Sequence, residues 1–240
     1  MSVGGDQPEP ARAAHQRAAH AGPRVLVLGE VRVEGTRGSV DPARAAQLAE
    51  IAAYVALRPG ATMAQLAQDI WPYGTTANHR NTIAARLRAW LGSTESGGPY
   101  FPPTRAGVRF SAGVGCDLSE FRNLYECGIH AYEAGEFPVA AGRLERAIGL
   151  VRGRPFAAVP EGRYGWAGEI FKGAGREIVS AALCLARIRM AERAWDAAAT
   201  AAGRGMAMGP DPDGILGPDY KALAQVWVEA EVRSGDRYEA

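Results

Sequence analysis

The chain has 240 residues, of which 47% are hydrophobic and 22% are charged, and its formal net charge is +1. This composition is typical of a globular protein that buries a core of its own, and it argues against a largely disordered chain. No apolar run approaches the roughly 18 residues that a membrane-spanning helix needs. The first 23 residues are rich in Ala, Pro, Gly and His and contain no apolar stretch. We therefore expect a disordered lead-in rather than a signal peptide, and a cytoplasmic protein that makes no membrane contact itself.

Charge is divided unevenly along the sequence. Residues 1–115 contain 12 arginines, no lysine and 8 acids, a net of +4. Residues 116–240 contain 15 basic and 18 acidic side chains, a net of −3. This asymmetry indicates two domains with different partners, which we place at residues 24–115 and 116–240.

The first predicted domain begins with β-structure. In RVLVLGEVRVEG (24–35), Val25, Val27, Val31 and Val33 alternate with polar or small residues. This period of two predicts a half-buried hairpin or meander with a bend at Gly29.

Two helices follow the predicted strands. Asp41 is a typical cap and Pro42 a typical first residue of a helix, and the pair Pro59-Gly60 ends the pattern. Thr62 then caps a short helix with the sequence MAQLAQDIW.

The turn PYGTT leads into a longer helix, which Thr76 caps and Gly92 ends. Its predicted buried stripe consists of Ile83, Leu87, Trp90 and Leu91. Beyond it, two β-prone pieces in YFPPTRAGVRFSAG (100–113) flank a predicted hairpin tip. The order of strands, helix, short helix, turn, longer helix and hairpin predicts an α+β winged helix-turn-helix domain.

The second half is predicted to be all helix, with a weak internal repeat. Phe137, Trp195 and Tyr238 each begin a segment in which small residues follow one turn later. That pattern is typical of the second helix of a tetratricopeptide-like pair, in which the aromatic fills the gap between helices and alanines let neighbouring helices approach closely. The fold class is therefore an α+β winged helix-turn-helix domain followed by an all-α tetratricopeptide-like domain.

The two halves together resemble a known pairing of domains. DPARAAQLAEIAAYVALRPGATMAQLAQDIWP, RNTIAARLRAWLG and YFPPTRAGVRFSAG resemble the winged helix of response-regulator effector domains, as found at the start of Streptomyces antibiotic regulatory proteins. DLSEFRNL, AAGRLERAIGLVRGRPFAAV and YGWAGE resemble the bacterial transcriptional activator domain that follows it. The pairing is also similar to the C-terminal part of actinobacterial membrane proteins that carry a LysM domain. The resemblance implies regulation of transcription, with protein contacts or self-association through the helical domain.

The face of the longer helix opposite its apolar stripe is the predicted DNA-binding surface. Asparagine amides can pair with adenine edges, arginine can reach guanine or phosphate, and small residues let a backbone approach a groove. The residues predicted to contact duplex DNA are Thr76, Asn78, Asn81, Thr82, Ala85, Arg86, Arg88, Arg105 and Arg109. The alternative interpretation is a solvated polar face on an ordinary surface helix.

The loop RGRPFAAVPEGRYGW (152–166) is the predicted protein-interaction site. Arg152, Arg154 and Arg163 lie among aromatic residues that include Trp166, a combination that suits an acidic or phosphorylated partner. The alternative is a loop that only wraps the helix pair, with its charges in water.

The sequence does not favour an enzyme. It contains no HExxH, CxxC, GxxxxGK[ST] or GxSxG motif, and we predict no catalytic residue and no cofactor. Cys116, Cys127 and Cys184 lack metal-ligand spacing, so we expect buried free thiols and no bound metal. The leading hypothesis is a DNA-binding transcriptional activator. The alternative is a protein-interaction module whose winged helix does not touch nucleic acid.

Overall fold

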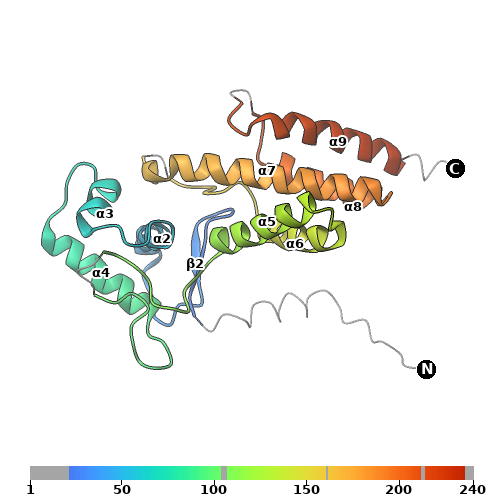
Figure 1. Cartoon of the computed structure of the whole chain (residues 1–240). Coiled ribbons are helices and arrows are strands. Elements are labelled where there is room, and N and C mark those ends of the chain that lie inside the picture. The colour runs from blue at the N-terminus through green and yellow to red at the C-terminus, as the bar shows by residue number, and fades with distance from the viewer. Residues whose placement is uncertain (1–21, 104–106, 161, 212–213, 236–240) are drawn as a thin grey trace, which may run out of the picture.

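The computed structural model of the chain describes residues 22–103, 107–160, 162–211 and 214–235. A small sheet and three helices form one end of the molecule, and a layered helical body forms the other (Figure 1). Most of the predicted lead-in at residues 1–23 lies outside the described residues. Its last two residues, Gly22 and Pro23, are buried, because the Pro23 carbonyl accepts a hydrogen bond from the Gly115 N–H at 2.9 Å.

The predicted hairpin forms, and a third strand joins it. β1 (Arg24–Leu26) pairs antiparallel with β2 (Arg32–Glu34), and Gly29 lies between them with φ of 140°. β3 (Gly115–Cys116) pairs parallel with β1, which gives the order β2-β1-β3. The predicted domain boundary at residues 115 and 116 therefore falls within a strand of this sheet.

The helices of the first half begin at the predicted caps. α2 (Pro42–Leu57) is capped by Asp41, and α3 (Met63–Ile70) by a capping box in which Thr62 and Gln65 satisfy each other's backbone N–H groups. α4 (Ala77–Leu91) is capped by the Thr76 hydroxyl, which accepts from the His79 N–H. Local capping chemistry therefore fixes where each helix starts.

The predicted hairpin after α4 forms only in part. Ser111 donates its N–H to the Tyr100 carbonyl at 2.9 Å, and the Phe101 and Phe110 rings meet edge to face at 6.0 Å. No strand is assigned between residues 93 and 112 where the chain is described, because Val108 turns away to exchange hydrogen bonds with the connection between α2 and α3, at Gly60 and Ala61. The predicted tip, including Arg105, lies outside the described residues.

The second half consists of helices that pack in layers. They are α5 (Asp117–Glu133), α6 (Phe137–Gly149), the single turn η1 (Gly165–Ala167), α7 (Gly168–Ala191), α8 (Trp195–Met206) and α9 (Pro218–Gly235). Small residues allow the close approach predicted from the repeat: a Cβ on Gly128 would lie 2.8 Å from Leu144, and one on Gly205 would lie 2.7 Å from the Ala182 Cβ.

Two expectations about this half need correction. Phe137 does not fill a buried gap between helices, because it lies on the Tyr132 ring with about half of its surface exposed. Cys127 is exposed, and Cys116 and Cys184 are only partly buried, so the thiols are free but not all buried.

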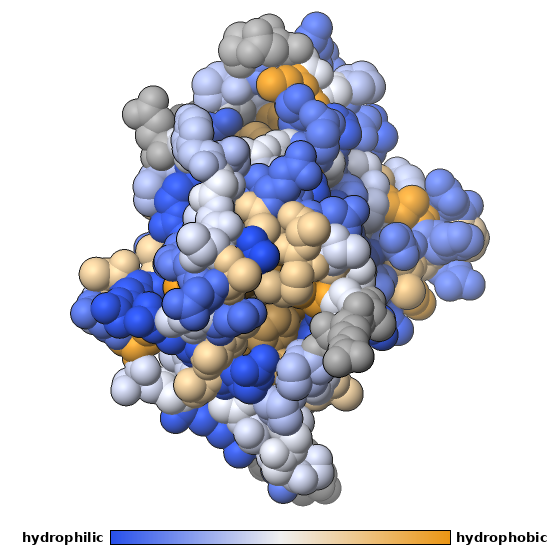
Figure 2. Space-filling view, turned by 90° about the vertical axis from the view of Figure 1, so that its left-hand side faces the viewer, coloured by the Kyte–Doolittle hydropathy of each residue, from blue (hydrophilic) through white to orange (hydrophobic). Residues whose placement is uncertain are grey.

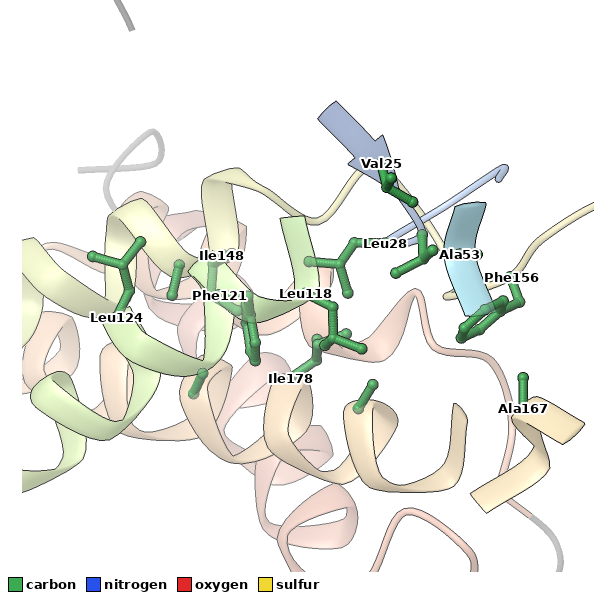
Figure 3. Close-up of a cluster of buried hydrophobic side chains, with 14 of the residues drawn as sticks. Val25, Leu28, Ala53, Leu118, Phe121, Leu124, Ile148, Phe156, Ala167 and Ile178 are labelled. Atoms are coloured by element: carbon green, nitrogen blue, oxygen red, sulfur yellow. The ribbon is translucent and has the colours of Figure 1, made fainter. Parts of the chain in front are cut away.

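One hydrophobic core joins the two ends of the molecule. Figure 3 shows it running from Phe156 and Ala53 of α2, past Val25 and Leu28, to Leu118 and Phe121 of α5 and Ile178 of α7. All of these side chains are at least nine-tenths buried. No helix in the described ranges is long and apolar enough to cross a membrane.

Candidate nucleic-acid interface

α3, the turn after it and α4 form the candidate DNA-contacting unit. The turn holds Gly74 in the left-handed region at φ 94° and leaves Tyr73 fully exposed. The Trp71 ring, at the end of α3, meets the His79 ring of α4 edge to face at 5.5 Å. This contact fixes the angle at which α4 leaves the turn.

The predicted buried stripe of α4 is confirmed. Ile83, Leu87, Trp90 and Leu91 are all at least nine-tenths buried and belong to the common core. Because one face of α4 is anchored in this way, the opposite face points to solvent. The predicted site residues that are exposed on it are Asn78, Asn81, Thr82, Ala85 and Arg86.

The exposed face of α4 is open and positively charged. α4 contains three arginines and no acid, and it lies at the end of the molecule away from α8 and α9 (Figure 1). The one acid of α3, Asp69, is neutralised by Arg58 at 2.8 Å and accepts a hydrogen bond from the Tyr54 hydroxyl. Arg86 makes no ion pair or hydrogen bond with the described residues, so its guanidinium is available to a ligand.

This end of the molecule is not uniformly polar. Figure 2 shows it from the side on which α3 and α4 lie, with hydrophilic surface around a paler, weakly apolar central area. A surface of this kind allows close backbone approach at its centre and charge contacts around it.

Arg88 differs from its predicted role. It is half-buried, its Nε donates to the Phe101 carbonyl at 2.9 Å, and its guanidinium lies 5.9 Å from the Phe101 ring centroid. Arg88 therefore holds the segment after α4 against the helix, and its Nε is not available for a base edge.

The remaining predicted DNA-contacting residues take several positions. Thr76 uses its hydroxyl to cap α4, and the Thr82 hydroxyl donates to the Asn78 carbonyl at 2.9 Å. Arg109 is exposed beside the α2–α3 connection, whereas Arg105 lies outside the described residues.

The predicted protein-interaction residues contact the first half of the chain instead of projecting freely. Arg163 pairs with the buried carboxylate of Glu50, which also accepts the Tyr164 N–H at 3.0 Å. The Trp166 ring packs edge to face on Tyr54 at 5.0 Å. That these residues also bind another protein stays a prediction.

Arg152 pairs with an acid of the second half that also binds the first half. Its guanidinium donates to Asp117 at 3.1 Å, and Asp117 also accepts the N–H groups of Val27 and Leu28 at 2.8 and 3.0 Å. Burial raises the pKa of Asp117, and these three donors oppose that rise. Arg154 is the exception: its guanidinium lies 5.0 Å from the Phe171 ring centroid and makes no hydrogen bond or ion pair with the described residues.

Sequence reasoning missed the acids that complete these contacts. Glu50 lies next to Ile51 on the apolar face of α2, and Asp117 directly follows β3. An acid on an otherwise apolar helix face was the available signal, because a carboxylate is rarely buried without a partner.

The described residues hold no obvious metal centre. No group of three or more His, Cys, Asp or Glu side chains within the described ranges is placed to hold a metal ion.

Comparison with known proteins gives a similarity of fold. No family model matches the sequence, and no curated protein sequence matches it. Among solved structures, the chain is similar to Mycobacterium tuberculosis EmbR, which was solved in complex with a low-affinity phosphopeptide. The TM-score is 0.51 and the sequence identity 16%, and the match covers 89% of this chain and 69% of EmbR. At that identity, the likeness shows that nearly the whole chain, the sheet end and the helical body together, shares the EmbR fold.

Proposed function

We propose that this chain is a DNA-binding transcriptional regulator of the activator type. In this proposal α3 and α4 form a helix-turn-helix, the segment after α4 is its wing, and the helical body contacts protein. The observation that carries the proposal is the exposed face of α4, where Asn81 and Ala85 lie opposite the buried stripe and Arg86 lies exposed at its flank.

The chemistry of this face suits the major groove. Asn78 and Asn81 lie in the first turns of α4, where the N-terminus of a recognition helix meets base edges. The N-terminal N–H groups of α4 and the positive end of its dipole favour a phosphate beside Thr75 and Thr76. The fold shared with EmbR supports a regulator of the antibiotic-regulatory type.

The helical body supports a protein partner. EmbR, of which the match covers 69%, was solved in complex with a phosphopeptide. On α9 of this chain, Trp227, Val228 and Val232 are 37%, 60% and 59% exposed. Neighbouring exposed apolar side chains of this kind often mark a surface that a protein partner covers. The proposed role is that of a binding protein and involves no catalysis and no cofactor.

The test is fluorescence anisotropy of labelled, pooled random duplex DNA across a salt series. We expect binding that weakens as salt rises, since phosphate contacts release counterions. Arg86→Ala should weaken binding and reduce the salt slope by about one unit, and Asn81→Ala should weaken it with little change in slope. Arg146→Ala, at an exposed position on α6, is the matched control.

Arg88→Ala is not a suitable probe of DNA contact, because it would also release the Phe101 segment. The absence of salt-dependent binding, or equal binding by the Arg86 and Arg146 variants, would contradict the DNA-binding proposal.

A second candidate function is a protein-interaction module that does not bind nucleic acid. The exposed apolar side chains of α9 favour it. Size-exclusion chromatography with light scattering on the wild type and on a Val228→Asp, Val232→Asp variant tests it. Self-association lost in the variant, together with no DNA binding by the wild type, would support this second candidate.

A further inference from the structure

A cavity of about 460 Å³ lies between the α6–α7 loop and the first turn of α7. The loop supplies most of its walls, and Phe171 of α7 closes one side. Figure 3 places Phe156 and Ala167, two of the lining residues, at the end of the shared core. A cavity of this volume is in the range that holds small organic ligands.

Two hydrogen-bond donors at this cavity have no partner in the described part of the chain. Arg154 lies over the Phe171 ring at 5.0 Å, and its guanidinium makes no hydrogen bond or ion pair there. The Tyr164 ring is mostly buried, but its hydroxyl is not enclosed by protein and has no hydrogen-bond partner among the same residues. Because Tyr164 lines the cavity, this accessible hydroxyl is free to donate to a ligand there.

The charge of the cavity favours an anion. No acid is among the described residues that line it, and the second arginine there, Arg163, is already neutralised by Glu50. Burial raises the pKa of the Tyr164 hydroxyl, with the nearby Glu50 carboxylate adding to the rise, so this group remains a proton donor at neutral pH.

The walls favour a ligand with an apolar body. Phe156, Val159 and Phe171 contribute apolar surface, and one free guanidinium is the only unpaired charge at the described lining residues. An arginine and a hydroxyl donor that line the same cavity can together bind one carboxylate, which accepts two N–H groups of the guanidinium and one O–H group. Inorganic phosphate carries more charge and offers nothing to the aromatic walls.

The geometry of the rim is fixed before any ligand arrives. Phe156, Ala158 and Tyr164 adopt left-handed φ angles of 56°, 58° and 60°, which residues with a Cβ rarely adopt. Backbone hydrogen bonds hold the loop in this shape: the Phe156 N–H donates to the Val27 carbonyl and the Ala157 N–H to the Gly29 carbonyl, both at 2.9 Å. A rim held in this way loses little entropy on binding.

A second, more polar cavity shows the contrast. It is lined by Tyr54, Arg58 and Asp69, and these three side chains already satisfy one another at 2.8 Å. The one charged pair at that cavity, Arg58 and Asp69, is therefore already neutralised.

We propose that the cavity between the α6–α7 loop and α7 binds a small aromatic carboxylate. Arg154 and Tyr164 hold the carboxylate, and Phe156 and Phe171 contact the ring. The site is separate from the exposed face of α4, and it does not depend on DNA binding.

Isothermal titration calorimetry of the full chain tests this proposal, with 2-naphthylacetate as the probe. The matched neutral probe is 2-naphthylacetamide, and inorganic phosphate is the second comparison. We expect saturable binding of the carboxylate, at least about tenfold weaker binding of the amide, and weaker binding of phosphate than of the carboxylate.

Variants locate the site. Arg154→Gln should weaken the carboxylate about tenfold or more, and Tyr164→Phe should weaken it by a smaller factor without destabilising the fold, since only an unpartnered hydroxyl is removed. Arg146→Gln, on exposed α6, should leave binding unchanged. Circular dichroism confirms that each variant is folded.

The proposal is overturned if the carboxylate gives no saturable heat at millimolar concentration. It is also overturned if the amide or phosphate binds as well as the carboxylate, or if the Arg154 and Arg146 variants bind alike. None of these outcomes bears on the DNA-binding proposal, which has its own assay.

Discussion

The contact between Glu50 and the α6–α7 loop should be a main determinant of stability, and Glu50→Ala tests it. The Glu50 side chain is 4% exposed, and it pairs with Arg163 and accepts the Tyr164 N–H at 3.0 Å. Removing one partner of a buried ion pair typically costs about 3–5 kcal/mol, and an unsatisfied buried N–H about 1–3 kcal/mol. The Arg163 side chain is 28% exposed and regains water, so we expect a total loss near the lower end, about 3 kcal/mol.

Urea unfolding followed by circular dichroism measures this loss. With an m-value of about 3 kcal/mol/M, the midpoint should fall by about 1 M at unchanged m. Glu50→Gln keeps an acceptor for the Tyr164 N–H, and it should lose less, about 1–2 kcal/mol.

Glu120→Ala is the control for the loss of an ordinary ion pair. Glu120 pairs with Arg24 at 2.7 Å and is 36% exposed, so its removal should cost at most about 1 kcal/mol. If Glu50→Ala costs no more than Glu120→Ala, the inference that this contact joins the two halves is refuted.

Three further predictions concern other parts of the molecule. Ala85→Glu puts a carboxylate at the centre of the exposed α4 face and should weaken DNA binding by more than about tenfold in the anisotropy assay; Ala197→Glu, exposed on α8, should not. Leu87→Ala, at a fully buried position, should lower the free energy of unfolding by about 2–5 kcal/mol in urea titrations, and a loss below about 1 kcal/mol would argue against the buried stripe. Exposed Cys127 should react with iodoacetamide before Cys184 at pH 8, because burial raises the pKa of Cys184 to about 11 and keeps its thiol protonated. The labelling rate of Cys184, followed by mass spectrometry, should rise as the pH approaches 11. Fast labelling of Cys184 at pH 8 would contradict this account.

Local signals explain which parts of the fold could be predicted. Asp41, Thr62 and Thr76 each cap the helix that the sequence assigned to them, because capping depends on residues only two or three positions away. The hydrophobic period of α4 predicted its buried stripe for the same reason.

Contacts between distant residues explain the rest. Arg163 and Glu50 are 113 positions apart, and an arginine in a loop has the same sequence signal whether its acid lies in the same chain or in a partner. Arg88 was predicted to face a DNA groove because its position on the helix suited that role, yet its partner, the Phe101 carbonyl, belongs to a segment that returns to the helix. Arg154 was predicted as an interaction residue, but the cavity that it lines with Tyr164 could not be predicted, because a cavity has no signature in sequence.

The two ends of the molecule are joined by the shared core and by backbone hydrogen bonds, which the α6–α7 loop donates to the carbonyls of Val27, Leu28 and Gly29. If the chain were cut after residue 115, these carbonyls and Glu50 would lose their hydrogen-bond partners. Because each end of the molecule depends on the other in this way, the intact chain should unfold in a single thermal transition. Because the shared core joins the two ends across the described residues, partners bound at α4 and at α9, as proposed above, would lie at a fixed distance and angle to each other. Two copies bound along a duplex would therefore present their helical bodies with a spacing dictated by the protein, which only certain arrangements of binding sites can match.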